Sequence, residues 1–512
     1  MTTKNRKSKG RQTTESIRQG PPRPSSLETA PRDEVIDMEE AIGLLKTTRP
    51  TFYRWLRAGK FRGMKTGRQW RFYRGDIEAF LRGEGPRIAL SAPITPLLKT
   101  LAAAYKELGG GALTPAGKTD LEQVAYLTLG VALLMPASDI HIHGIVENEA
   151  VIRMRVDGVL HNVARFDSRL LSPMMEQWKV LTSADLSEKA VSLDGHGMST
   201  VNGVPLDLRS SFVQTALGDS LTIRVLSRNV VYGFRLEKLQ ISPEAKSRLA
   251  EGLKASTGII VVTGPSGCGI TTTLYSALTH LASPEVKVMT AENPVEVLLE
   301  NVVQIPVRPE LGMAFPAVIM RIFRSDPDIV MVGETRDRQT LELCGKAAVA
   351  GHLILTSLHT PSAVGTLYHM GSLLEDPGLI SLGSVLRLVL AQRLLRKVCT
   401  ECSTAYDPPR GLLEEAKTRA TAGGLKWETL PRKFRTTHGC SRCGKTGYSG
   451  RVAVGEALTI TPAILQALRS GVESNNLEKL AIEQGMVTLA AQGIKLAATG
   501  VTTLDEVLRI FR

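Results

Sequence analysis

The pattern of apolar and polar positions along the 512-residue chain predicts a mixed α/β protein. Residues 258–263, "GIIVVT", form a continuous apolar run with the length of a buried strand, and residues 270–282 continue as a mostly apolar helix. Shorter apolar runs at 329–332 and within "GHLILTSLHT" (351–360) predict two further strands. Since short apolar runs of this kind are typical of buried strands, this region is predicted to be the main α/β domain.

Other patterns of apolar and polar residues flank this central region. Residues 138–160 and 203–226 alternate apolar and polar side chains, which predicts paired strands in a small α/β domain that precedes the main one. Residues 460–512 predict short amphipathic helices separated by Gly and Thr. The apolar stretch 124–138 is shorter than the roughly 20 residues of a membrane span and ends near a proline, so a buried helix is predicted there.

Residues 35–81 predict a helix, a turn, a second helix, a hairpin and a closing helix. Pro50 suits the first turn of the second helix, where its missing N–H costs nothing. This pattern resembles the excisionase/MerR-type winged helix-turn-helix family, which binds duplex DNA. The alternative is a module that docks on a protein. The basic residues expected to contact DNA are Arg49, Arg54, Arg57, Lys65, Arg68 and Arg71.

The net charge of +13 is concentrated in the N-terminal region. Residues 1–32 carry +6 and residues 49–74 carry +9, so the rest of the chain carries −2. The first segment is polar and rich in Pro and Ser, which predicts a disordered basic tail and no targeting signal. Local basicity indicates an anionic partner for this region, and the missing targeting pattern predicts a cytoplasmic protein.

The sequence "GPSGCGITT" (264–272) is close to a phosphate-binding loop. Its glycines and Thr271 fit the pattern G-x-x-x-x-G-K-[ST], but Ile270 stands where the lysine belongs. Backbone N–H groups and a helix N-terminus can hold phosphates without a side chain, so nucleotide binding is still expected. The expected nucleotide-binding residues are Gly264, Pro265, Ser266, Gly267, Cys268, Gly269, Ile270, Thr271 and Thr272.

Further segments resemble the ATPases of type II secretion and type IV pilus assembly (the GspE/PulE/PilB-like family). "TAENPVE" (290–296), "VGETRD" (332–337) and "GHLILTSLHT" are similar to that family's Asp box, Walker B and His box. The resemblance implies a RecA-like ring hexamer that binds ATP and Mg²⁺, lies at the inner membrane and moves a platform protein there. It also implies functional side chains, which are Glu292, Glu334, His352, His359, Arg209 and Arg224.

Several positions depart from the family's pattern. Ile270 replaces a lysine, Asn293 an aspartate and His196 an arginine, and His143 and Gly144 stand where Glu and Pro are usual. We therefore expect nucleotide affinity to fall about ten- to a hundredfold and hydrolysis to fall about 10²-fold or more.

Four of the six cysteines form two C-x₂-C pairs, separated by 37 residues. In an apparently cytoplasmic protein such pairs predict a closed, structural zinc site more readily than disulfides. Reduced thiols and a redox pair are the alternatives. The predicted Zn²⁺ ligands are Cys399, Cys402, Cys440 and Cys443.

These observations predict seven segments and leave three functions open. The protein is a motor ATPase with a weakened site, a nucleotide-responsive subunit in rings with an intact paralogue, or a DNA-binding regulator that oligomerises through its RecA-like core. The predicted segments are the tail (1–32), the winged helix-turn-helix (33–84), a linker (85–118), the small α/β domain (119–232), the RecA-like domain (233–398), the Cys₄ zinc module (399–455) and a C-terminal helical segment (456–512).

Overall fold

The computed structural model describes residues 34–57, 61, 63–66, 69–82, 88, 90–111, 119–184, 192–227, 234–374 and 382–511. The chain divides into two compact units, residues 1–87 and residues 88–512. Within the described residues, no helix has the length and apolar character needed to cross a membrane. The predicted tail, 1–32, lies outside the described residues.

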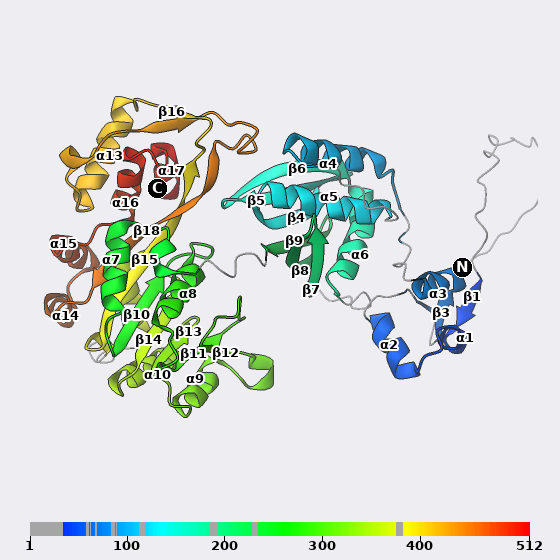
Figure 1. The fold of residues 1–512 in the computed structure, drawn as a ribbon, viewed down its shortest axis with the longest axis horizontal. Helices are drawn as coiled ribbons and strands as arrows, with labels where there is room; N and C mark the ends of the chain where they lie inside the picture. Colours follow the sequence, from blue (N-terminus) through cyan, green and yellow to red (C-terminus); the bar gives the residue numbers. More distant parts are fainter. Residues whose placement is uncertain are drawn as a thin grey trace, which may run out of the picture. The chain divides into compact units, whose positions relative to one another are not determined.

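The first unit is a small helix-turn-helix fold with a three-stranded antiparallel sheet of order β1-β3-β2 (Figure 1). An Asp37/Glu40 capping box begins its first helix. Phe52, Phe61 and Phe72 are fully buried and contact one another, which gives the unit an aromatic core. The elements are β1 (Val35–Asp37), α1 (Met38–Leu44), α2 (Arg49–Arg57), β2 (Met64–Thr66), β3 (Gln69–Tyr73) and α3 (Arg74–Leu81).

The second unit begins with an antiparallel six-stranded sheet of order β6-β5-β4-β9-β8-β7. Side chains alternate across it, so that Ile140, Ile142 and Ile152 are buried in a core shared with the helices. The elements are α4 (Thr95–Glu107), α5 (Asp120–Leu134), β4 (Ala137–Val146), β5 (Glu149–Val156), β6 (Val159–Asp167), α6 (Leu171–Leu181), β7 (Ser192–Val201), β8 (Val204–Thr215) and β9 (Gly218–Ser227), with a short 3-10 helix, η1 (Ser168–Leu170).

Helix α4 lies in the segment 85–118, where a linker was expected. Leu97, Leu101 and Tyr105 recur every four residues, and all three are buried in the core of the small domain. The Pro/Gly/Ala-rich flanks of this segment hid the helical period, so α4 within it is part of the fold.

The main domain is built on a seven-stranded sheet of order β12-β11-β13-β14-β10-β15-β18 (Figure 1). All neighbouring strands are parallel except the β15/β18 pair. Alternate side chains of β10 belong to two different apolar clusters. Ile259 and Val261 lie in one cluster, and Ile260 and Val262 lie in the other. Both faces of the sheet are therefore covered. This is the predicted RecA-like core.

The elements of the main domain follow in chain order. They are η3 (Leu236–Lys238), α7 (Pro243–Gly252), β10 (Gly258–Thr263), α8 (Ile270–Leu281), β11 (Val288–Glu292), β12 (Val302–Pro306), η4 (Pro309–Leu311), α9 (Phe315–Phe323), β13 (Ile329–Val332), α10 (Arg338–Val349), β14 (Leu353–Leu358), α11 (Ala363–Leu374), β15 (Leu386–Val398) and β18 (Tyr448–Thr459).

The excursion between β15 and β18 carries its own small elements, β16 (Ser403–Ala405), α13 (Arg410–Ala422), η5 (Trp427–Thr429) and β17 (Arg435–Thr437). β16 and β17 pair antiparallel. The segment 399–455 was expected to be one zinc module, but residues 448–455 belong to β18 and so to the large sheet. The predicted C-terminal helices are α14 (Pro462–Arg469), α15 (Ser474–Glu483), α16 (Leu489–Ala498) and α17 (Leu504–Ile510).

Candidate functional site

The loop 264–269 joins the buried strand β10 to helix α8 and takes a shape that requires glycine. Gly267 and Gly269 have φ values of 79° and 92°, in the left-handed region that L side chains avoid. Gly264 is also closely packed, because a Cβ atom there would lie 2.5 Å from the sulfur of Cys268. Because these positions carry no side chains, a ligand above the loop can approach its backbone closely.

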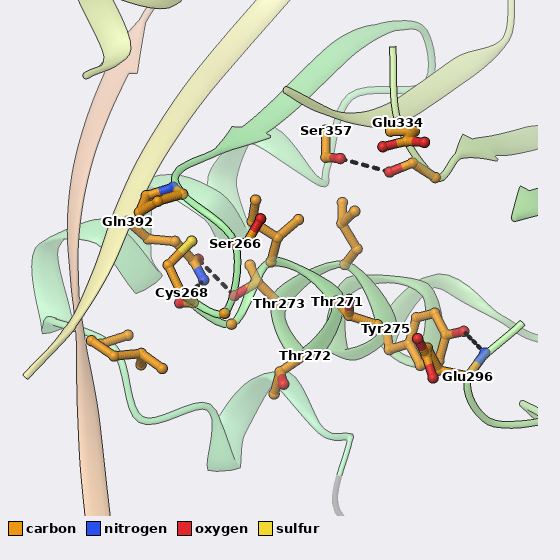
Figure 2. Close-up of a pocket in the computed structure, with 18 of the residues that line it drawn as sticks. Ser266, Cys268, Thr271, Thr272, Thr273, Tyr275, Glu296, Glu334, Ser357 and Gln392 are labelled. Atoms are coloured by element: carbon orange, nitrogen blue, oxygen red, sulfur yellow. Dashed lines mark hydrogen bonds between the residues drawn. The ribbon is translucent and has the colours of Figure 1, made fainter. Parts of the chain in front are cut away.

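Helix α8 begins at Ile270, with Gly269 as an N-cap that makes no side-chain hydrogen bond to the helix. The N–H groups of a first helical turn have no partners within the helix, and the helix dipole favours an anion there. Thr271 and Thr272 are exposed at this end. Figure 2 shows them on the first turn of α8, next to the loop. This strand–loop–helix arrangement is suited to binding phosphate groups.

Ile270 is half-buried and does not extend freely from the loop. It packs against the apolar cluster that contains Leu236, Leu274 and Leu278. A branched apolar side chain cannot donate a hydrogen bond, so this position adds packing but no positive charge.

The buried Gln392 of β15 holds the loop from behind. Its amide donates to the carbonyl of Cys268 (2.8 Å), and its oxygen accepts from the Thr273 hydroxyl (2.8 Å). Figure 2 shows this contact between Gln392 and Thr273. Gln392 was not predicted as a site residue, although a glutamine within the apolar strand segment "VLAQRLL" was an available signal. Burial raises the pKa of the Cys268 thiol, so this cysteine is an ordinary packed residue.

Glu334 follows strand β13 and lines a cavity that the loop 264–269 also lines. One of its oxygens lies 2.8 Å from Nη2 of Arg336 and 3.7 Å from Nε2 of His359. Nδ1 of His359 lies 3.1 Å from the carbonyl oxygen of Gly264. The predicted carboxylate, the predicted histidine and the phosphate loop are therefore brought together at the ends of parallel strands.

Glu292 ends strand β11 and is buried, at 4% exposure. Its carboxylate accepts hydrogen bonds from the hydroxyls of Tyr275 and Thr290 and from the amide of Gln304. Burial and this contact with Glu292 raise the pKa of Tyr275, so the phenol stays protonated. Glu292 lines the cavity together with Asn293, but three donors already occupy its oxygens.

These residues line a cavity of about 1160 Å³ that also includes residues of the small domain. Arg224 lines it and lies 3.2 Å from Asp139. Arg209 does not line it but forms an ion pair with the lining residue Glu296 (3.0 Å). His352 precedes β14 at the end opposite His359 and stacks on Phe323, so the structure does not bring His352 to the cavity.

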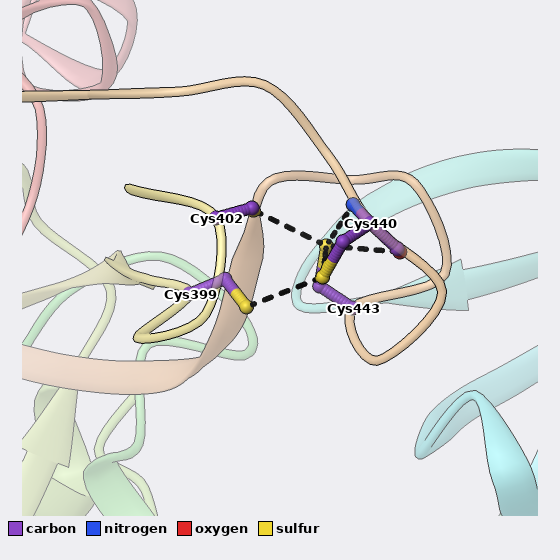
Figure 3. A group of neighbouring side chains, drawn as sticks. All are labelled: Cys399, Cys402, Cys440 and Cys443. Atoms are coloured by element: carbon purple, nitrogen blue, oxygen red, sulfur yellow. Dashed lines mark hydrogen bonds between the residues drawn. The ribbon is translucent and has the colours of Figure 1, made fainter. Parts of the chain in front are cut away.

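The four predicted metal ligands form one cluster (Figure 3). Their sulfur atoms lie within 4.8 Å of one another, and three of the pairs are 3.8–3.9 Å apart. Tetrahedral zinc with Zn–S bonds of about 2.3 Å requires sulfurs about 3.8 Å apart, so the donor set fits zinc. Burial opposes ionisation of Cys443, but N–H groups of Cys440 and Gly447 donate to its sulfur and lower the pKa to about 6.

In the helix-turn-helix unit, Arg54 of α2 is exposed. Arg49 forms an ion pair with Glu39. Arg71 donates to Gln69 (3.1 Å) and lies 3.9 Å from Asp37. Arg68 and the side chains of Arg57 and Lys65 lie outside the described residues.

Comparison with known proteins gives two family matches. The model described as "Type II/IV secretion system protein" matches residues 116–509, and a helix-turn-helix domain model matches residues 35–85. The second match confirms the fold predicted for the N-terminal unit.

Individual relatives agree with the first match. Type II secretion system protein E of Aeromonas hydrophila is 36% identical over 386 residues, which are 75% of this chain and 74% of that protein. The type IV pilus assembly ATPase PilB of Myxococcus xanthus is 33% identical over 383 residues, 75% of this chain and 66% of that protein. The X-ray structure of the Legionella pneumophila ATPase DotB matches with a TM-score of 0.54 at 19% identity, covering 78% of this chain and 97% of DotB, which supports the fold.

Proposed function

This chain belongs to the type II/IV secretion system protein family, and we propose that it binds ATP at the cavity above residues 264–272. The observation that carries the proposal is the juxtaposition of the glycine loop, the uncapped start of α8 and Glu334 around one cavity. Backbone N–H groups of the loop and the Thr271 hydroxyl hold the phosphates. Mg²⁺ bound with the nucleotide would supply positive charge to the phosphates, and Glu334 and Glu292 are the cavity carboxylates that would hold it.

Hydrolysis at this site is weak, because Ile270 provides neither charge nor a hydrogen bond. A lysine in this position makes charge-assisted bonds to phosphate oxygens, and losing one preorganised donor costs about 10²–10³ in rate. Arg209, Arg224 and His359 are the groups that respond to the nucleotide, each by exchanging a present contact for one with a phosphate. Binding is therefore weakened about ten- to a hundredfold and turnover about 10²-fold or more.

The test compares ATP binding and steady-state hydrolysis, with Mg²⁺, in the full chain and in the variants Ile270→Lys and Ile270→Leu. The lysine variant is expected to raise both affinity and rate, whereas the leucine variant, which keeps the apolar packing, should match the wild type. Equal rates for the wild type and Ile270→Lys would contradict a weakened site. Absence of binding in all three proteins would contradict nucleotide binding altogether.

The proposal extends to assembly and place in the cell. The chain forms a homo-hexamer, or enters a ring with an intact paralogue, at the cytoplasmic side of the inner membrane. There it drives or regulates a secretion or pilus machine by contacting a platform protein. The support is the family membership and the relatives named for type II secretion and pilus assembly. Light scattering of the purified chain with and without ATP distinguishes a ring from a monomer.

A second candidate function is duplex DNA binding by residues 33–84, which the helix-turn-helix match and the exposed Arg54 favour. Arg54 lies on α2, a short helix that can enter a major groove. Binding should weaken steeply with salt, and Arg54→Ala should weaken it further, while Arg410→Ala on the exposed start of α13 should not. Salt-independent or absent DNA binding would favour a protein-docking role, and regulation through DNA would then be excluded.

A further inference from the structure

Five Lys and Arg side chains line the cavity above the phosphate loop, and they differ in what they contact. Arg224 and Arg451 pair with Asp139 (3.2 Å) and Asp157 (3.3 Å). An anionic ligand is attracted most strongly by a cation that carries no carboxylate partner.

Two of the other three are already engaged. Arg336 forms an ion pair with Glu334 (2.8 Å), and Arg155 donates to the carbonyl of Gly158 (3.0 Å). The fifth cation is Lys238, which is exposed and makes no side-chain hydrogen bond or ion pair with any residue that the structure describes. Lys238 is thus the lining cation that can turn to a ligand without first breaking a contact.

The backbone of Lys238 is held against the helix that starts at the phosphate loop. Lys238 ends the short helix η3 (Leu236–Lys238), and Leu236 is buried in the same apolar cluster as Leu274 and Leu278 of α8. Oε1 of Glu237 lies 3.7 Å from Nδ1 of His280, on the same helix.

A ring contact of Phe234, just before η3 in the chain, fixes the same segment. Phe234 packs edge-on against Tyr275 of α8, with centroids 5.3 Å apart. The segment 234–239 therefore cannot move independently of α8. Lysine has a long flexible stem, so a fixed backbone and an exposed side chain allow the ammonium group to turn into the cavity.

We propose that Lys238 supplies the positive charge that position 270 lacks, by binding the phosphate chain of the nucleotide from the cavity wall formed by η3. The inference rests on the nucleotide-binding function proposed above. Four carboxylates, Asp139, Glu292, Glu296 and Glu334, line the same cavity, so a polyphosphate there gains from each unpaired cation. Because Lys238 is not part of the loop, it strengthens binding more than it restores the preorganised geometry that hydrolysis needs.

The experiment titrates a fluorescent ATP analogue into the full chain and into Lys238→Met, Lys238→Arg and the control Lys254→Met. Lys254 is an exposed lysine paired with Glu251 and does not line the cavity. Lys238→Met should weaken binding about five- to fiftyfold, with the loss growing smaller at high salt, whereas Lys238→Arg and Lys254→Met should stay within about twofold.

A double variant separates a direct charge effect from a structural one. If Lys238 and a lysine at 270 act on the same phosphates, Lys238→Met should reduce the affinity for the analogue much less in the Ile270→Lys background than alone. If the wild type binds the analogue and Lys238→Met binds it with the same affinity, the inference is overturned and the proposed function stays intact. If the wild type fails to bind the analogue at all, the proposed function itself fails. An equal loss in Lys238→Arg indicates a packing role for the segment and also overturns the inference.

Discussion

Nη1 of Arg209, on strand β8 of the small domain, lies 3.0 Å from the Glu296 carboxylate, which follows strand β11 in the main domain. Both side chains are about one-third exposed. The pair gives the arginine a carboxylate partner beside the cavity, so a phosphate group that recruits Arg209 must first replace Glu296.

Replacing the carboxylate should make Arg209 available to the nucleotide. We expect Glu296→Gln to tighten ATP binding severalfold while changing the free energy of unfolding by less than about 1 kcal/mol, since partly exposed ion pairs contribute little. Titration with a fluorescent ATP analogue measures the affinity. Glu300→Gln, which removes the same charge from a nearby exposed position, is the control. Weaker binding in Glu296→Gln would instead assign Glu296 to the site itself.

Gln392 should prove important for the shape of the phosphate loop. In Gln392→Leu, the buried Thr273 hydroxyl and the Cys268 carbonyl lose their partners, which should cost about 1–3 kcal/mol in the free energy of unfolding. ATP affinity should fall as well, because the loop is no longer held from behind. Chemical denaturation and nucleotide titration test both effects. Thr273→Val should lower the free energy of unfolding less in the Gln392→Leu background than alone. Additive effects of the two substitutions would show that Thr273 and Gln392 are not coupled.

The cysteine cluster should hold about one zinc ion per chain. Cys399→Ser should remove most of the metal and lower the denaturation midpoint, because the site closes the excursion that contains β16 and β17. Metal analysis of the purified protein gives the stoichiometry. Cys344→Ala should keep its zinc, since Cys344 is fully buried elsewhere and burial raises its pKa to about 12. A wild type that holds no zinc, and a Cys399→Ser variant with the same denaturation midpoint as the wild type, would favour reduced thiols.

Glu506 should make stability depend on pH in the acidic range. Burial opposes its ionisation, but Arg509 and Arg396 donate to its carboxylate and leave its pKa below the usual value. A lowered folded-state pKa means that the stabilisation is present above the unfolded pKa of about 4.3 and is lost as the pH falls through the folded value.

The matching variant is Glu506→Gln, which leaves Arg396 without its partner in a largely buried place. At pH 7 the free energy of unfolding should fall by about 2–4 kcal/mol relative to wild type. This difference should shrink as the pH is lowered below about 4. Urea denaturation across this pH range measures it, and a difference that stays constant with pH would show that the carboxylate charge is not responsible.

Features carried by short stretches of sequence were predictable. The apolar run of β10, the glycines after it and the start of α8 are adjacent in the chain, so periodicity and glycine positions were enough to place them. The C-x₂-C spacing likewise identified four cysteines that the structure gathers into one cluster. The resemblance to a known family then connected Glu334 and His359, which strand order brings together.

Contacts between distant segments were not predictable in the same way. Thr273 and Gln392 are 119 positions apart, and no local pattern indicates that β15 passes behind the loop. Lys238 was not singled out because its exposure and its place on the cavity wall depend on how the preceding residues pack on α8. The sequence also could not show that the Ile270 side chain packs inward.

Strand β15 (Leu386–Val398) belongs to both sites at once. It carries Gln392 behind the phosphate loop and runs directly into Cys399 of the cysteine cluster. Because strand side chains alternate between faces, inserting or deleting a single residue in this strand turns a buried contact outward and shifts everything beyond it. The chain is thus better able to vary in length at exposed turns of the excursion 403–439, such as residues 431–432, whereas in 386–399 it can change only by substitution. A selection for functional variants should recover insertions in the first segment and reject them in the second.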